Sequence, residues 1–210
     1  MIGGNNVLLI KRGITMRIWA MTVAIAAALL TCSCLPVTTN SPVGSTVGFK
    51  PDPALYGVWR DENHEKDSSG FISFLRDEAD ADGMTAVLVT PSSSGGEWQV
   101  FQLKTASLGG RSFMNAREEF VDGKPAHDGL AGQDIPVLYR VKGRTLTLLL
   151  LDEKKTAAAI RSGAIAGTIE PGEYGDVHIT ADAASLDKFM QSDAGAALFS
   201  APILVMKKID

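Results

Sequence analysis

The sequence predicts a mainly β protein: an antiparallel, barrel-like sheet with one or two short helices near the C-terminus. From Leu55 onward, short apolar segments are broken by turn residues, which is the pattern of antiparallel strands joined by hairpins. One late segment, 145–151, is apolar on both faces, as expected of a central strand that is covered on both sides. The alternative is an α+β protein with an open antiparallel sheet.

Turn residues at 77–83, 108–110 and 142–144 join the predicted strands into hairpins. On 98–104, alternation places Trp98 and Val100 on one face and Phe101 and Leu103 on the other. A glycine-containing stretch, Glu119 to Asp134, is predicted to be a surface loop. The expected strands are 55–60, 71–76, 84–90, 98–104, 111–117, 137–141, 145–151, 177–180 and 203–206.

Two segments carry helix signals. The first, 153–162, is rich in Ala and Lys, and Gly163 follows it as a glycine cap. The second begins at Asp182, an N-cap residue, and runs through Gln191. Its spacing of apolar residues predicts a buried stripe formed by Leu186, Phe189 and Met190.

The N-terminus has the three-part layout of a secretory signal. Lys11, Arg12 and Arg17 form a basic region, 18–30 is an uncharged apolar run, and small residues follow. The run is short for a membrane-spanning helix, which needs about 20 apolar residues. We therefore predict a signal peptide over 1–33, with Met16 as an alternative start.

The segment Leu30-Thr31-Cys32-Ser33-Cys34 resembles a bacterial lipoprotein signal, in which a cysteine after a small residue is lipidated and becomes the first residue of the mature chain. The resemblance implies lipidation, palmitate included, at Cys34 rather than Cys32, because Ser33 is an accepted residue before the cleavage point and Thr31 is a poorer one. Leu35 is not aspartate, and in a Gram-negative host this implies the outer membrane, with the protein facing the periplasm. An ordinary secretory signal and an uncleaved anchor are the alternatives.

Composition divides the rest of the chain into two parts. Residues 34–50 are rich in Pro, Thr, Ser, Gly and Val without periodicity and predict a flexible tether, whereas 51–210 is long enough for one β-rich domain. Removal of the three basic signal residues leaves 17 of 20 Lys and Arg against 24 Asp and Glu, a net charge near −7. Such a charge argues against nucleic acid as a partner. Both cysteines lie in the signal region, so an internal disulfide is excluded from the domain.

The triplet Gly57-Val58-Trp59 on the first predicted strand resembles the Gly-x-Trp signature of lipocalins and other calycin barrels. The resemblance implies an up-and-down barrel in which Trp59 packs across the closed end, and it raises the prospect of an internal ligand cavity. The mixture of helices and strands after residue 151 departs from the lipocalin pattern of eight strands and one helix.

Charged and nucleophilic residues give no strong catalytic or metal signature. The run Asp61, Glu62, His64, Glu65 and Asp67 is interpreted as a solvated loop rather than a metal site, and the acidic residues of 77–82 as a hairpin tip. No serine lies in a Gly-x-Ser-x-Gly elbow. We predict no cofactor, no metal and no enzymatic activity.

The predicted activity is binding by a membrane-anchored envelope lipoprotein. Aromatic side chains of the barrel could line a pocket for a small apolar ligand, and the candidate residues are Trp59, Trp98, Phe101 and Tyr139. The same residues also fit an ordinary core. A protein–protein interaction module of the envelope is the alternative function, and a hydrolase is the third.

Overall fold

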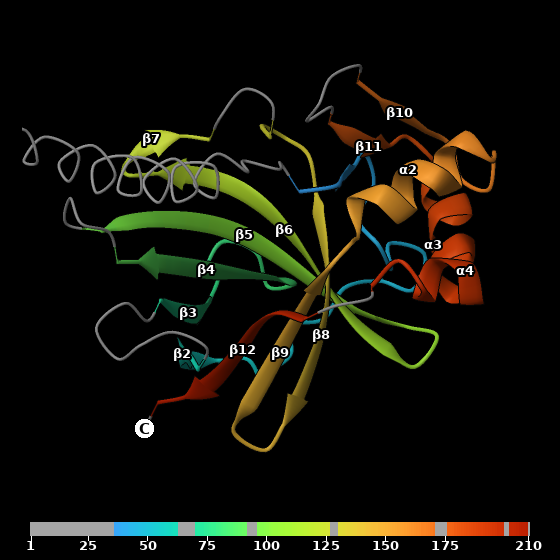
Figure 1. Ribbon diagram of the computed structural model, residues 1–210. Helices are drawn as coiled ribbons and strands as arrows, with labels where there is room; N and C mark the ends of the chain where they lie inside the picture. Colours follow the sequence, from blue (N-terminus) through green and yellow to red (C-terminus); the bar gives the residue numbers. More distant parts are fainter. Residues whose placement is uncertain are drawn as a thin grey trace, which may run out of the picture. The chain divides into compact units, whose positions relative to one another are not determined.

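Eight antiparallel strands form a closed barrel in the computed structural model (Figure 1). The structure describes residues 36–62, 70–91, 96–126, 130–170, 176–199 and 202–209. Neighbouring strands follow the order β5-β4-β3-β2-β12-β9-β8-β6, and pairing of β6 with β5 closes the ring. This confirms the predicted fold class and excludes the open sheet. The barrel strands are β2 (Gly57–Asp61), β3 (Phe71–Arg76), β4 (Gly83–Thr90), β5 (Glu97–Leu108), β6 (Arg111–Val121), β8 (Ile135–Lys142), β9 (Thr145–Leu150) and β12 (Pro202–Lys208).

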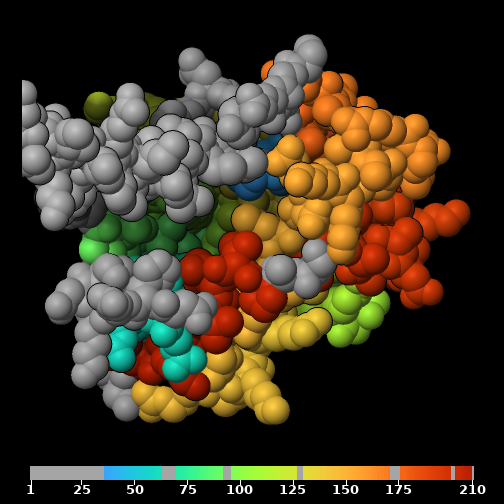
Figure 2. All heavy atoms as spheres, in the orientation of Figure 1, coloured from blue at the N-terminus to red at the C-terminus, as the bar shows by residue number. Residues whose placement is uncertain are grey.

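Smaller elements cover part of the outer wall of the barrel. A three-stranded sheet has the order β1-β11-β10, and β7 extends the main sheet beside β6. Figure 2 shows the helical segments, coloured orange to red, gathered on one flank of the domain. These elements are β1 (Thr38–Thr39), β7 (Lys124–Pro125), α2 (Glu153–Arg161), β10 (Gly167–Ile169), β11 (Val177–Ile179), α3 (Ala183–Gln191) and α4 (Asp193–Ala196).

The strands divide their apolar side chains between two cores, because successive residues of a strand point to opposite faces. On β9, Leu146 and Leu148 belong to a cluster to which all eight barrel strands contribute, and this cluster fills the barrel. Leu149 and Leu151 pack outside with residues of α2 and α3. The prediction that 145–151 is buried on both faces is therefore confirmed.

The predicted hairpin turns at 108–110 and 142–144 are also confirmed. Leu108 pairs with Arg111, and the two residues between them, Gly109 and Gly110, have φ of +59° and +73°. A two-residue turn of this kind requires positive φ at both positions, and its twist matches that of the flanking strands. The glycines therefore fix the register of the β5–β6 hairpin, which closes the barrel.

Both helices begin and end where the sequence predicts. The Asp182 side chain accepts a hydrogen bond from the backbone N–H of Ser185 (3.0 Å) at the start of α3. Gly163 follows α2 with φ of +73°, and its N–H donates to the carbonyl of Ile160 (3.0 Å). Within the described ranges, no helix has the length and apolar character needed to cross a membrane.

The prediction of a flexible tether over 34–50 is wrong for its described part, 36–50. This segment forms β1, and Val37 and Val43 are 3% and 0% exposed. Its Pro, Thr and Val residues lack a local period because their partners come from distant parts of the chain. The ordered domain therefore begins at Pro36 rather than at residue 51.

Two buried polar side chains hold this segment. Asn115 on β6 accepts from the N–H of Val43 (2.7 Å) and donates to its carbonyl (2.9 Å). Asp187 on α3 is 2% exposed and accepts from the N–H of Gly44 (2.6 Å) and of Thr46 (3.0 Å). Backbone groups that face the core are thus satisfied by side chains instead of by a strand ladder.

The stretch Glu119 to Asp134 is more ordered than the predicted surface loop. Strand β6 extends to Val121 and β7 pairs with it, whereas β8 begins at Ile135. Leu130 and Asp134 are 7% and 5% exposed. The prediction is wrong at both ends of the stretch, because the sheet continues where the composition suggests a loop.

Replacement of Asp187 by Ala should lower the free energy of unfolding by about 2–3 kcal/mol, because it leaves the N–H groups of Gly44 and Thr46 without their acceptor. Urea unfolding followed by circular dichroism measures the change. The neighbouring Lys188 is exposed, so Lys188→Ala is the matched control and should change stability by less than about 0.5 kcal/mol. Equal effects of the two substitutions would contradict the role assigned to Asp187.

Candidate functional site

The barrel interior brings together three of the four aromatic residues that the sequence nominates. Trp59 and Tyr139 are 0% and 4% exposed, and the partly buried Phe101 packs against the same inner cluster. Trp98 is 41% exposed on the outer wall. Alternation along β5 explains the separation, because Trp98 and Phe101 are three residues apart and point to opposite faces.

Trp59 lies on β2, opposite the end of β12. Its indole Nε1 donates to the carbonyl of Leu55 (2.6 Å), which satisfies the one polar atom of the ring. Lys208 pairs with Trp59 across the sheet, and its ammonium lies 5.2 Å from the ring centre. A cation at this distance from an indole is attracted to the ring face.

Tyr139 supplies a hydroxyl at the barrel wall. It donates to the carboxylate of Asp52 at 2.9 Å. Burial, and then the hydrogen bond and charge of Asp52, raise the pKa of Tyr139 above its ordinary range. The hydroxyl therefore stays protonated and acts as a hydrogen-bond donor rather than as a base.

Side chains fill the described part of the interior. Large residues such as Met84, Leu103 and Met206 are 0–2% exposed there. A small apolar ligand would have to displace some of them, so binding inside the barrel stays a prediction that the geometry does not favour. The inner cluster consists of Leu55, Trp59, Ile72, Phe74, Met84, Ala86, Leu103, Met114, Ala116, Ile135, Val137, Tyr139, Leu146, Leu148 and Met206.

The acidic runs have structural roles where the structure describes them. Asp77 and Asp80 accept backbone N–H groups within the β3–β4 connection, and Asp80 pairs with Lys104 (3.1 Å). Asp61 is 4% exposed, and Glu62 lies near Lys207. The described ranges contain no group of three or more His, Cys, Asp or Glu side chains that could hold a metal. His64, Glu65, Asp67 and His127 lie outside them, as does Cys34.

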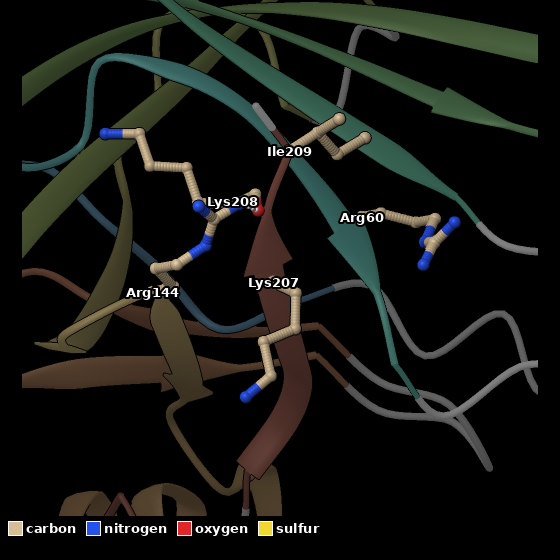
Figure 3. A pocket seen from close by; sticks show the side chains of 5 residues that line it. All are labelled: Arg60, Arg144, Lys207, Lys208 and Ile209. Carbon is tan, nitrogen blue, oxygen red and sulfur yellow. Dashed lines mark hydrogen bonds between the residues drawn. The ribbon is translucent and has the colours of Figure 1, made fainter.

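A cationic pocket opens on the surface where β12 ends (Figure 3). It has a volume of about 350 Å³ and is lined by Arg60 on β2, Arg144 in the β8–β9 turn, and Lys207, Lys208 and Ile209 at the C-terminal end. Figure 3 shows the cationic side chains arranged around the end of β12, with Arg60 and Arg144 on opposite sides of this strand. All four of the ionisable side chains that line it are basic, on a chain whose net charge is −4.

Strand pairing places two of these cationic residues opposite each other. Arg60 and Lys207 occupy directly opposite positions on the antiparallel strands β2 and β12. Like charges in such a pair destabilise a sheet. Lys207 is partly compensated, because Glu62 lies 3.6 Å away and the Thr145 hydroxyl accepts from it at 2.8 Å. The Arg60 guanidinium makes no hydrogen bond or ion pair with any residue that the structure describes.

Arg144 and Lys208 are held more firmly. The Arg144 guanidinium donates to the carbonyl of Lys208 (2.8 Å), and the Lys208 N–H donates to the carbonyl of Arg144 (2.9 Å). The Lys208 ammonium donates to the carbonyl of Ala54 (3.3 Å). The pocket thus combines positioned groups of Arg144 and Lys208 with the Arg60 guanidinium, which has no partner among the described residues, an arrangement suited to an anion.

Comparisons with known protein families, curated proteins and solved structures return no match. The function is therefore inferred from the geometry.

Sequence reasoning missed the cationic pocket. Its residues lie at three separate places in the chain, and only the pairing of β12 with both β2 and β9 unites them. The sequence signal for a cationic site was the pair Lys207-Lys208, which follows a predicted strand in an acidic domain. Successive residues of a strand point to opposite faces of the sheet, so such a pair places one positive charge on each face.

A second polar cluster surrounds His178 on β11. Its Nδ1 lies 2.7 Å from the Thr38 hydroxyl and its Nε2 lies 2.7 Å from the Asn40 side-chain oxygen. A hydroxyl beside an imidazole can serve nucleophilic catalysis. Here, however, Thr38 is 5% exposed and its hydroxyl also donates to the Gln133 side chain. The cluster therefore joins β1 to β11, and a hydrolase stays a prediction without a formed site.

The stability of the domain should fall as the pH is lowered from 7.5 to 5.5. In the folded state, burial lowers the pKa of His178 below its ordinary value of 6.5. The unfolded chain therefore binds the proton more readily, and unfolding is favoured as the pH falls through that ordinary pKa. Thermal unfolding at both pH values measures the effect. His178→Gln should reduce this pH dependence, and an unchanged dependence would show that His178 does not contribute.

Proposed function

We propose that this protein is a cell-envelope lipoprotein, held by a lipid on Cys34 to the outer membrane of a Gram-negative cell on its periplasmic side, that binds an anionic small molecule in the cationic pocket. Its activity is binding and not catalysis. The cationic pocket is the observation that carries the proposal. Cationic donors line it, and the five lining residues include no serine, cysteine, histidine or carboxylate.

The chemistry of the pocket selects phosphate-bearing ligands. Arg60 and Arg144 present planar guanidinium groups, which bind phosphate oxygens through paired N–H donors. Lys207 adds a compact charge that can move from Glu62 to the ligand. A bound anion would also relieve the like-charge pairing of Arg60 with Lys207. A bound phosphate would therefore gain these contacts and also reduce the repulsion between Arg60 and Lys207.

Strand β8 separates Thr39, which follows the proposed lipid attachment residue, from the Arg144 side of the pocket. Thr39, five residues after Cys34, is hydrogen-bonded to Asp134, immediately before β8. Arg144 follows the other end of β8, and eight residues of strand at about 3.3 Å each separate the two ends by about 26 Å. The Arg144 side of the pocket thus lies at the other end of β8 from Thr39.

Other functions have less support from the geometry. An apolar ligand would compete with the packed inner cluster, as described above. A protein–protein interaction module remains compatible with the fold, because a rigid barrel can present any surface. The cationic pocket, in contrast, favours one class of ligand, an anion, because four of its five lining residues are Arg or Lys.

Pyrophosphate should bind to the full mature chain in isothermal titration calorimetry at low salt, and Arg60→Glu should weaken it about fivefold. The expected loss corresponds to about 1 kcal/mol, the scale of exposed charge contacts. Lys154 is exposed on α2, away from the pocket, so Lys154→Glu gives the same change in net charge as a matched control. Equal weakening by both variants, or no binding by the unaltered protein, would overturn the proposed ligand.

Cys34→Ser should abolish incorporation of labelled palmitate and release the protein from the membrane fraction. The thiol is the acceptor of the lipid, and each buried methylene of that lipid contributes about 0.8 kcal/mol to membrane binding. Cys32→Ser is the matched control and should retain label and membrane binding. Labelling of the Cys34→Ser protein would show that the anchor is elsewhere.

A further inference from the structure

An apolar surface that none of the described elements covers lies on the outer wall of the barrel, over β3 to β6. We name it the outer patch. It is formed by Phe71, Val87, Val89, Trp98, Val100 and Phe120. Val89, Trp98 and Phe120 are 41%, 41% and 44% exposed. Apolar side chains that gather on one surface, rather than lying singly, usually mark a contact surface.

The register of the strands makes the outer patch continuous. Val89 pairs with Phe71 on one side and with Trp98 on the other, whereas Val100 pairs with Phe120. Trp98 and Phe120 are diagonal neighbours, a separation that large aromatic side chains can span. In Figure 1 the ends of β4, β5 and β6 that carry these residues lie side by side. The helices cover a different part of the wall, formed by residues such as Phe113, Leu138 and Leu149.

We propose that the outer patch docks onto the surface of the lipid bilayer that holds Cys34. This inference rests on the lipid anchor of the proposed function, and it adds an orientation for the domain. Trp is enriched where proteins meet the interface of a membrane, because its ring is apolar and its N–H is polar. The exposed charges near the outer patch are mixed, because Glu97, Glu119 and Asp122 lie there with Lys124. Arg60 pairs with Phe71 at the edge of the outer patch, and we base the contact on apolar burial rather than on attraction to charged lipids.

The length of chain between the lipid and the barrel selects the bilayer as the occupant. Cys34 lies four residues before Thr38 in β1, a reach of at most about 14 Å. Thr39 is hydrogen-bonded to Asp134, and the next residue, Ile135, pairs with Ala116 on β6. Phe120 lies four residues further along β6, about 13 Å away. The barrel is thus held close to the membrane by the end that carries the outer patch.

Fluorescence quenching by lipid tests this docking. The mature chain retains two of the three tryptophans, and Trp59 is buried while Trp98 is exposed. Lipidated protein is placed in phosphatidylcholine–phosphatidylethanolamine vesicles with and without brominated acyl chains. We expect the emission from Trp98, obtained as the difference between the unaltered protein and Trp98→Phe, to fall at least twofold in the brominated vesicles. The remaining emission of Trp98→Phe should not change.

The controls separate failure of docking from failure of the anchor. Flotation of the same samples reports the anchor, and Cys34→Ser should not float. Unquenched Trp98 in protein that floats would overturn docking and leave the anchor intact, and photo-crosslinking at position 98 would then test whether a protein covers the outer patch instead. Equal flotation of Cys34→Ser would overturn both the anchor and the docking that depends on it. Phe120→Ser should reduce the quenching of Trp98, whereas Leu75→Ser, on the same outer wall near the opposite end of β3, should leave it unchanged.

Discussion

Closure of the sheet between β5 and β6 is the constraint on which the rest of the structure depends. Once these strands pair, every barrel strand has two neighbours and the inner face is separated from solvent. The inner positions must then be apolar, and the buried Trp59 and Met206 meet this requirement. Closed pairing also leaves few places for polar chemistry. It is confined to the ends of the strands and to the outer wall.

The described elements cover only part of the outer wall. Helices α2 and α3 and the small sheet cover the wall around Phe113 and Leu149. The buried Asp187 on α3 then binds the segment that precedes the barrel, so the cover and the N-terminal segment stabilise one another. The wall over β4 to β6 receives no such cover from the described elements, and Trp98 and Phe120 remain exposed there.

Local features were predictable from the sequence, whereas long-range pairings were not. The glycine pair at 109–110 and the caps at Asp182 and Gly163 act within a few residues, so their sequence determines their geometry. Composition misled the interpretation of 36–50, because the groups that order it, Asn115 and Asp187, lie far along the chain. The four candidate aromatic residues are divided between the inner and outer faces of the barrel by the alternation of side chains along a strand. This alternation could be predicted from the sequence. The cationic pocket required the pairing of β12 with β2, for which no local signal exists.

The cationic pocket and the outer patch are both exceptions to what stability alone would favour. Arg60 opposite Lys207 costs stability in the sheet, and an exposed Trp98 gains less from folding than a buried one would. Neither the outward-facing pair Arg60 and Lys207 nor the outer patch is needed to fill the barrel. A residue that costs stability without supporting the fold is best explained by a contact made outside the folded chain. The two surfaces meet on the outer wall, because Arg60 of the pocket pairs directly with Phe71 of the outer patch, so the proposed anion and the proposed membrane contact would lie side by side.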